Sequence, residues 1–190
     1  MNAWWQLWSG LFSPKTCDWI ISEGLKLPSQ PGMVGHGHET VRNENKRLST
    51  IRWVKREGRL AQIWDRSVEL FQEANYNAFG FDLSTLREMQ FTEYQARPGG
   101  QQDYYTWHED LTWATNTPYQ RKLSLVIQLS DPADYDGGDL QLQQEPPERR
   151  HLRTRGTAIV FPSFHSHQVT PVTRGTRYSL VAWHEGPNFR

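Results

Sequence analysis

Two histidine-bearing segments carry residue types that could hold a metal ion. His108 and Asp110 form a His-x-Asp unit. In an extended chain, side chains two residues apart point to the same face, so both could bind one ion without bending the backbone. The second segment, residues 161–172, offers His165 and His167 as alternatives for a third ligand. Two histidines and one carboxylate form the facial set that suits Fe(II) and leaves other coordination positions open.

The competing metal hypothesis is a zinc hydrolase, but its usual His-Glu-x-x-His motif is absent from the sequence. Arg177 extends the iron hypothesis instead. An iron oxygenase that oxidises a dicarboxylic 2-oxo acid must anchor the distal carboxylate of that acid. A guanidinium suits this anchor because it stays charged when buried and donates two parallel hydrogen bonds to a carboxylate. We therefore expect Arg177 to be a co-substrate anchor.

The segment between His167 and Arg177 contains a candidate turn, residues 173–175. If these residues form a three-residue hairpin loop with Gly175 in the left-handed conformation, Pro171 pairs with Arg177. His167 and Arg177 would then share the inward face, roughly 13 Å apart along the strands. A two-residue loop would turn Arg177 to the opposite face.

Helical periodicity comes before these segments. A first helix is expected to begin after Ser13, which is followed by proline, and to end by Pro28. A second is expected over about 60–79, with Gly80 as the left-handed residue that follows it. The polar stretch 28–50 between them predicts an irregular loop with the length of a substrate lid.

After Gly80 the hydrophobic period changes to two, which predicts strands. The alternating or β-branched runs lie at 89–94, 123–130, 140–142, 157–161 and 177–183. Several short strands after two helices predict a mainly β fold with the helices packed on one sheet. We expect a single domain over 1–190, with a helical N-terminal part over about 1–85 and a catalytic β-core over about 86–190. The basic stretch 145–150 is expected to be a solvated loop.

Composition limits the classes of function. With 21 Lys+Arg and 21 Asp+Glu the formal net charge is zero, so no overall field attracts nucleic acid or an anionic membrane. No apolar run approaches the length of a membrane span, and the first residues lack the basic start of a secretory signal. A lone cysteine, Cys17, cannot form an internal disulfide. We expect a cytoplasmic protein, a monomer or homodimer, without nucleic-acid or membrane partners.

The aromatic content, with 9 Trp, 7 Tyr and 8 Phe, has two interpretations. Large side chains could fill a small core, or they could line a cleft for a ligand. Composition does not choose between the two. The residues that would line such a cleft are Trp4, Trp5, Trp8, Trp107 and Trp113.

These motifs, taken in order, resemble the 2-oxoglutarate- and Fe(II)-dependent dioxygenases, and within them the prolyl 4-hydroxylase-like branch. The resemblance covers about Gln90 to Arg190, roughly half of the chain. The matching motifs are Tyr105-Thr-Trp-His108-Glu-Asp110, Gly137-Gly-Asp-Leu140, Phe161-Pro-Ser163, His167-x-Val-x-Pro-Val172, Gly175-x-Arg177 and Trp183 with Gly186-Pro187.

The resemblance implies a distorted double-stranded β-helix, a cupin-like jelly roll whose mouth holds the iron. It selects His167 over His165 as the third ligand beside His108 and Asp110, and leaves His165 as a wall or supporting residue. It implies that Arg177 pairs with the 5-carboxylate of 2-oxoglutarate. The cofactors implied are Fe(II), 2-oxoglutarate and O2, with ascorbate as an optional addition. The further residues expected to contact the co-substrate are Tyr94, Tyr105 and Gln128.

The implied reaction is hydroxylation of a C–H bond, most often of proline in a peptide or protein, coupled to decarboxylation of 2-oxoglutarate to succinate and CO2. A free amino acid or small metabolite is the alternative substrate. A non-catalytic jelly-roll binding module is the alternative of another class. The residues expected to line a peptide groove are Tyr104, Trp107, Trp113 and Arg121. The remaining histidines are expected to face solvent: His184 outward from its strand, and His36, His38 and His151 in loops.

Overall fold

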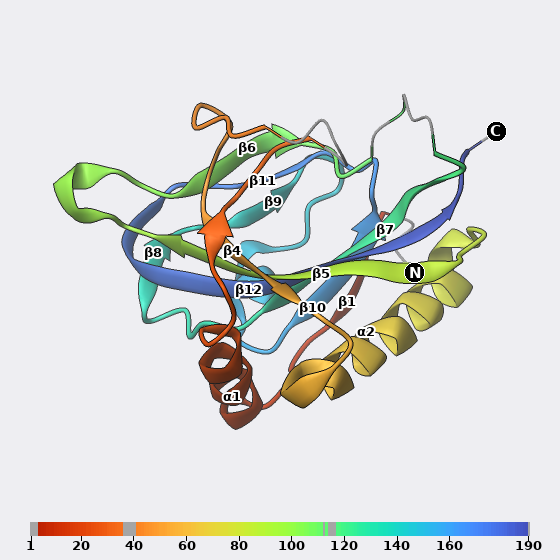
Figure 1. The fold of residues 1–190 in the computed structure, drawn as a ribbon, viewed down its shortest axis with the longest axis horizontal. Helices are drawn as coiled ribbons and strands as arrows, with labels where there is room; N and C mark the ends of the chain where they lie inside the picture. The colour runs from red at the N-terminus through yellow and green to blue at the C-terminus, as the bar shows by residue number, and fades with distance from the viewer. Residues whose placement is uncertain (1–3, 36–40, 112, 114–116, 190) are drawn as a thin grey trace.

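The computed structural model describes residues 4–35, 41–111, 113 and 117–189. They form two facing antiparallel sheets with helices on the outer side of the larger one (Figure 1). The large sheet contains β1 (Gln6–Trp8), β2 (Gln30–Pro31), β4 (Thr50–Val54), β5 (Thr85–Gln95), β7 (Tyr119–Gln128), β8 (Tyr135–Gly137), β10 (Ala158–Pro162) and β12 (Val172–Pro187). The small sheet contains β3 (Arg47–Leu48), β6 (Tyr104–His108), β9 (Leu140–Leu142) and β11 (His167–Val169).

The strand order of the large sheet is β1-β10-β7-β12-β5-β4-β2, with β8 paired to one end of β12. That of the small sheet is β3-β6-β11-β9. Most neighbours in these orders are not consecutive in the chain, β4 and β5 being the exception, as in a jelly roll wound from two sheets. The predicted fold, mainly β and of the double-stranded β-helix type with helices on one sheet, is confirmed.

In the described part of the chain, three α-helices accompany the sheets: α1 (Pro14–Gly24), α2 (Ala61–Ala74) and α3 (Arg149–Arg153). The hydroxyl of Ser13 accepts a hydrogen bond from the Thr16 amide, which confirms the predicted start of the first helix. The second begins after a short 3-10 turn, η2 (Gly58–Leu60), and ends in a wider helical turn, η3 (Asn75–Phe79). Gly80 follows with φ of 64°, the left-handed residue that was predicted. None of the described helices combines the length and apolarity needed to cross a bilayer.

The large sheet is buried on both faces, and this determines where the strand side chains go. On one face Leu125 and Ile127 pack with Phe71 of α2 in the core beneath the helices. On the other face Val126 packs with Val169 in a second core between the sheets. Alternate side chains of these strands therefore enter two different buried cores, because the helices cover one face of the large sheet and the small sheet covers the other.

The predicted hairpin at 173–175 is wrong. Residues 172–187 form one continuous strand, β12, whose first part pairs with β8 and whose remainder pairs with β5 and β7. Gly175 does have a positive φ, of 69°, but its role is close approach: a Cβ there would lie 2.0 Å from the Asp134 carbonyl oxygen. Arg177 consequently pairs with Tyr94 on β5 and not with Pro171.

Four further expectations need correction or restriction. His184 does lie on the opposite face of β12 from Arg177, but that face is covered: its ring is buried, with its centroid 5.3 Å from that of Phe71. The stretch 28–50 is not wholly irregular, because it contains β2 and β3. The stretch 145–150 runs into α3, so His151 is helical and half-buried. Two of the histidines expected in loops, His36 and His38, lie outside the described residues.

Candidate active site

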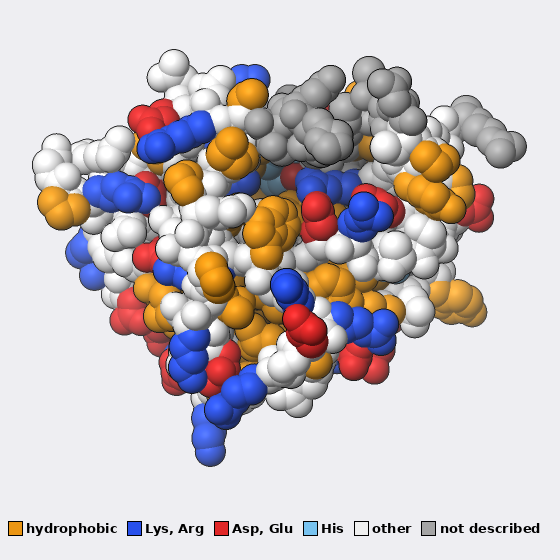
Figure 2. Space-filling model, viewed as in Figure 1, with side chains coloured by type: hydrophobic (Ala, Val, Ile, Leu, Met, Phe, Trp, Pro, Cys, Tyr) orange, Lys and Arg blue, Asp and Glu red, His pale blue; other side chains and the backbone are white. Residues whose placement is uncertain are grey.

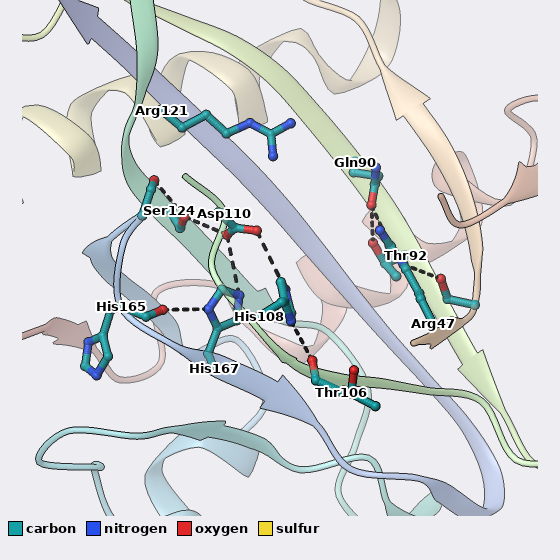
Figure 3. Close-up of polar contacts among 12 residues, drawn as sticks. Arg47, Gln90, Thr92, Thr106, His108, Asp110, Arg121, Ser124, His165 and His167 are labelled. Carbon is teal, nitrogen blue, oxygen red and sulfur yellow. Dashed lines mark hydrogen bonds and ion pairs between the residues drawn. The ribbon is translucent and has the colours of Figure 1, made fainter. Parts of the chain in front are cut away.

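The three predicted ligand residues converge where the end of β6 meets the start of β11, the two inner strands of the small sheet. His108 is the last residue of β6, Asp110 follows it, and His167 begins β11 directly opposite His108. The His108 Nε2 lies 3.7 Å from one Asp110 carboxylate oxygen, and the His167 Nε2 lies 3.5 Å from the other. One ligand atom from each residue lies within 4.8 Å of the other two. Figure 3 shows the side chains pointing toward one another.

Backbone carbonyls fix which nitrogen of each imidazole faces the centre of the cluster. The Nδ1 of His108 lies 2.8 Å from the Thr106 carbonyl oxygen, and the Nδ1 of His167 lies 2.9 Å from that of His165. A carbonyl only accepts, so each Nδ1 carries a proton and Nε2 is the nitrogen that can coordinate a metal ion. Burial and the neighbouring His167 lower the pKa of His108 to about 3, which keeps that imidazole neutral.

Asp110 is held as a carboxylate by a short hydrogen-bonded chain. Its Oδ2 accepts from the hydroxyl of Ser124 at 2.7 Å, and the Ser163 hydroxyl lies 3.0 Å from that of Ser124. Burial raises the pKa of Asp110, but the adjacent His167 and the Ser124 hydroxyl are among the groups that lower it below its usual value. Two imidazole nitrogens and one carboxylate on one side of an ion fit Fe(II).

The cluster opens into a cavity of about 820 Å³ between the two sheets. Its walls include Arg177 and Val181 from β12 of the large sheet and His167 and Val169 from β11 of the small sheet. In Figure 2 histidine surface is visible inside the hollow on this face, beside acidic and basic side chains. His167 and Arg177 therefore do face one space, although they reach it from opposite sheets and not along one hairpin.

Arg177 is almost completely buried, with 2% of its surface exposed. Its Nε donates to the Gln128 side-chain oxygen at 3.0 Å, and its guanidinium carbon lies 5.9 Å from the Tyr94 ring centroid. The Gln128 amide nitrogen donates in turn to the Ser130 carbonyl and to the hydroxyl of Tyr135. Gln128 thus orients Arg177, and its own side chain is not among those that line the cavity.

Tyr94 and Tyr105 both line the cavity, from opposite sheets. The ring of Tyr105 stacks on that of His108, with 3.4 Å between the centroids. Burial raises the pKa of Tyr105 to about 12, so its hydroxyl keeps its proton. Both tyrosines therefore line the same cavity as the three metal-ligand candidates and Arg177.

His165 does not join the cluster. Its ring points away from the three ligands (Figure 3), and its Nε2 accepts a hydrogen bond from the Gln144 amide. Its contribution to the cluster is the backbone carbonyl that His167 uses. Among the residues expected in a peptide groove, Trp107 and Arg121 line the cavity, whereas Tyr104 and Trp113 are not among its lining residues.

Sequence reasoning missed two features of this site. Ser124 was detectable, since the alternation of the run 123–130 places it on the same strand face as Gln128. Arg47 was not: it lies in a two-residue strand, too short for any periodicity, inside the stretch read as a loop. It is buried, lines the cavity and has its guanidinium carbon 4.7 Å from the Tyr105 ring centroid.

Comparison with known proteins places this geometry in a family. A protein named PKHD-type hydroxylase from Sphingopyxis alaskensis is 33% identical over 154 residues, which is 80% of this chain and 65% of that protein. Another of that name, from a Synechococcus strain, is 41% identical over 61 residues, covering 32% of this chain and 27% of the relative. The matches thus span between about a quarter and two thirds of these relatives' length.

Solved structures support the same fold. A Pseudomonas putida prolyl-4-hydroxylase superposes with a TM-score of 0.71 at 19% identity, covering 96% of this chain and 92% of that one. A Trichoplax adhaerens prolyl hydroxylase superposes with a TM-score of 0.72 at 14% identity, covering 96% and 84%. The model of the 2OG-Fe(II) oxygenase superfamily matches residues 89–185, which include every metal-ligand candidate and Arg177. The chain therefore belongs to the 2OG-Fe(II) oxygenase superfamily.

Proposed function

We propose that this protein is an Fe(II)- and 2-oxoglutarate-dependent dioxygenase that hydroxylates a C–H bond, with proline in a peptide or protein as the substrate. The observation that carries the proposal is one cavity that holds both a two-histidine, one-carboxylate cluster and a buried arginine without an acidic partner among the described residues. The names of the hydroxylase relatives support the choice of reaction, and the peptide complex of the Trichoplax adhaerens enzyme supports the choice of substrate.

In this proposal His108, Asp110 and His167 hold Fe(II), and Arg177 holds the 5-carboxylate of 2-oxoglutarate. When bound, iron, 2-oxoglutarate and O2 supply the oxidation: one oxygen atom enters the substrate C–H bond, the other enters succinate, and CO2 is released. The protein positions the groups that bind the metal and the co-substrate. The carbonyls at Thr106 and His165 aim both imidazole lone pairs at one point, and Gln128 aims the guanidinium.

The cavity walls separate this chemistry from bulk water. Arg177 and His167 are buried and His108 is half-buried, so charge interactions with a bound diacid are stronger than they would be at the surface. Tyr94 and Tyr105 flank the path between metal and anchor with protonated hydroxyls that can donate to a carboxylate or keto oxygen.

The test is succinate release by purified, Fe(II)-loaded protein given 2-oxoglutarate and a panel of proline peptides, with free amino acids beside them. We expect peptide-dependent succinate and a product 16 mass units heavier, since one oxygen atom is inserted. Turnover on free amino acids alone would contradict the substrate class. Absence of stoichiometric metal and 2-oxoglutarate binding would contradict the enzyme itself and favour a binding module.

A further inference from the structure

The cavity contains a second buried guanidinium, Arg47, with 8% of its surface exposed. Its nitrogens donate to three neutral acceptors: the Ser49 hydroxyl at 2.8 Å, the Met33 carbonyl at 3.1 Å and the Gln90 side-chain oxygen at 2.9 Å. No acidic side chain of the described chain forms an ion pair with it. A guanidinium has five N–H donors, so Arg47 can still donate hydrogen bonds to a ligand. Burying its charge without a counter-charge costs free energy.

The other two arginines of the cavity differ from Arg47 in ways that matter. Arg121 is neutralised, because its guanidinium lies 2.5 Å from the Glu88 carboxylate and over the face of Trp183. Arg177 also has only a neutral partner, and the proposed function gives it the distal carboxylate of 2-oxoglutarate. Arg47 is thus the remaining buried cation of the described cavity walls that has no anion assigned to it.

Arg47 lies close to the proposed reaction centre. The Tyr105 ring contacts both groups, with its centroid 3.4 Å from that of His108 and 4.7 Å from the Arg47 guanidinium carbon. These two distances place that carbon no more than about 8 Å from the His108 ring. A small molecule bound to Arg47 would therefore have the rest of its atoms within reach of the metal ligands.

The charges of the filled cavity leave room for one more anion. Fe(II) and the guanidinium groups of Arg47 and Arg177 are positive, while Asp110 and the two carboxylates of 2-oxoglutarate are negative. One positive charge remains, and Arg47 is the group that carries it without a partner. The charged side chains Lys46 and Glu109 also line the cavity, but they are exposed at its rim and opposite in sign.

We propose that Arg47 binds a carboxylate of the primary substrate, so that this enzyme acts on a molecule with an acidic group close to the reacting C–H bond. The inference rests on the proposed function, since it takes the cavity as the reaction site. Two sources share this chemistry: the carboxylate of a free or C-terminal proline, and an acidic side chain next to proline in a peptide. The geometry fixes the carboxylate, and the experiment separates the sources.

The experiment measures binding, not turnover, in protein loaded with Mn(II) and saturated with 2-oxoglutarate. Two matched pairs of probes are titrated by calorimetry: N-acetyl-L-proline against its amide, and N-acetyl-prolyl-aspartamide against N-acetyl-prolyl-asparaginamide. We expect the acid of at least one pair to bind about tenfold or more tightly than its neutral partner, as for one charged hydrogen-bonded contact. Absence of that preference in both pairs would overturn the proposal.

Variants then assign the preference to a residue. Arg47→Gln should abolish it, Arg47→Lys should keep part of it, and Arg52→Gln, which removes a guanidinium paired with Glu93 and outside the cavity lining, should leave it intact. A preference that survives Arg47→Gln would refute the assignment. The assignment would also be refuted if Arg47→Gln mainly lowered the affinity for 2-oxoglutarate, since Arg47 would then bind the 1-carboxylate of that co-substrate. If Arg47→Gln does not fold, the test is whether Arg47→Lys prefers the acid probes less strongly than the wild type does.

The two proposals fail separately. If the wild-type protein binds neither Mn(II) nor 2-oxoglutarate, the proposed function fails, and the probe titration repeated on metal-free protein still measures the carboxylate preference. If metal and 2-oxoglutarate bind and no acid is preferred, only the role of Arg47 fails.

Discussion

Replacing Arg177 by methionine should separate ligand binding from folding. The guanidinium is buried to 2% exposure, and its described partner is the neutral amide of Gln128. Without it, the distal carboxylate of 2-oxoglutarate would be buried unpaired. Removing one partner of a buried charge pair costs about 3–5 kcal/mol, which corresponds to roughly a hundred- to several-thousand-fold loss of affinity for 2-oxoglutarate.

The same substitution should have little effect on the free energy of unfolding. In the protein without co-substrate, the buried Arg177 charge has no acidic partner among the described residues, and methionine fills similar space without that charge. The substitution removes one hydrogen bond to Gln128, which is worth about 1 kcal/mol. It also removes the cost of burying an unpaired charge, which offsets that loss. The free energy of unfolding of the variant should therefore lie within about 1–2 kcal/mol of that of the wild type.

A control arginine should give the opposite pattern. Arg153 pairs with Asp139 at 2.8 Å and donates to the carbonyls of residues 132, 135 and 137. Arg153→Met should lower the free energy of unfolding by a few kcal/mol and change 2-oxoglutarate affinity far less. Calorimetric titration of Mn(II)-loaded protein and urea unfolding measure the two quantities. A methionine at 177 that leaves 2-oxoglutarate affinity within threefold of the wild type would refute the anchor role.

Three further outcomes are expected. His167→Ala should abolish stoichiometric Mn(II) binding measured by calorimetry, whereas His165→Ala should retain it, because the His165 ring points away from the cluster; the reverse ranking would refute the ligand choice. Gly138→Ala should weaken 2-oxoglutarate binding and lower Tm, because φ is +61° and a Cβ would lie 2.8 Å from Val172 and 3.1 Å from the Arg177 side chain; unchanged affinity would show that the anchor tolerates displacement. Burial lowers the pKa of His184, so the unfolded chain takes up the proton first and stability falls as pH drops below about 6.5; His184→Leu should make the fall in urea-unfolding free energy between pH 7 and 5 shallower without removing it, because His108 contributes a fall of the same sign, and an unchanged slope would show that His184 does not contribute.

The parts of the fold that follow local patterns could be predicted from the sequence. The start of α1 and the glycine after η3 have capping signals within a few residues, and the long strands alternate over enough positions to reveal their period. The His-x-Asp unit is local in sequence as well, but only His108 lies in the extended β6. Asp110 follows the strand in a bend, where its amide donates to the Ser163 carbonyl.

The failures have a common cause, which is that the covering of a strand is set by distant segments. His184 was placed on the correct face of its strand, but α2, some hundred residues earlier in the chain, buries that face. Gly175 was placed in the correct backbone conformation, but the conformation serves contact with β8 and not a turn. Arg47 has a two-residue strand and a side chain that reaches Gln90 on the other sheet, which no periodicity encodes.

The site is divided between the two sheets, and this division determines how substitutions in the core between them affect ligand binding. The metal-ligand candidates come from β6, the residues after it and β11 of the small sheet, while Arg177 and its support Gln128 come from β12 and β7 of the large sheet. The distance between metal and anchor is therefore set by the separation of two packed sheets, whose intervening core includes Val126 and Val169. Substitutions that thin or thicken this core should disturb the fit of a diacid between metal and anchor, because carbonyls fix the two histidines within the small sheet and an amide fixes Arg177 within the large sheet. Asp110 is the ligand candidate that links the two sheets, since it accepts from Ser124 of β7.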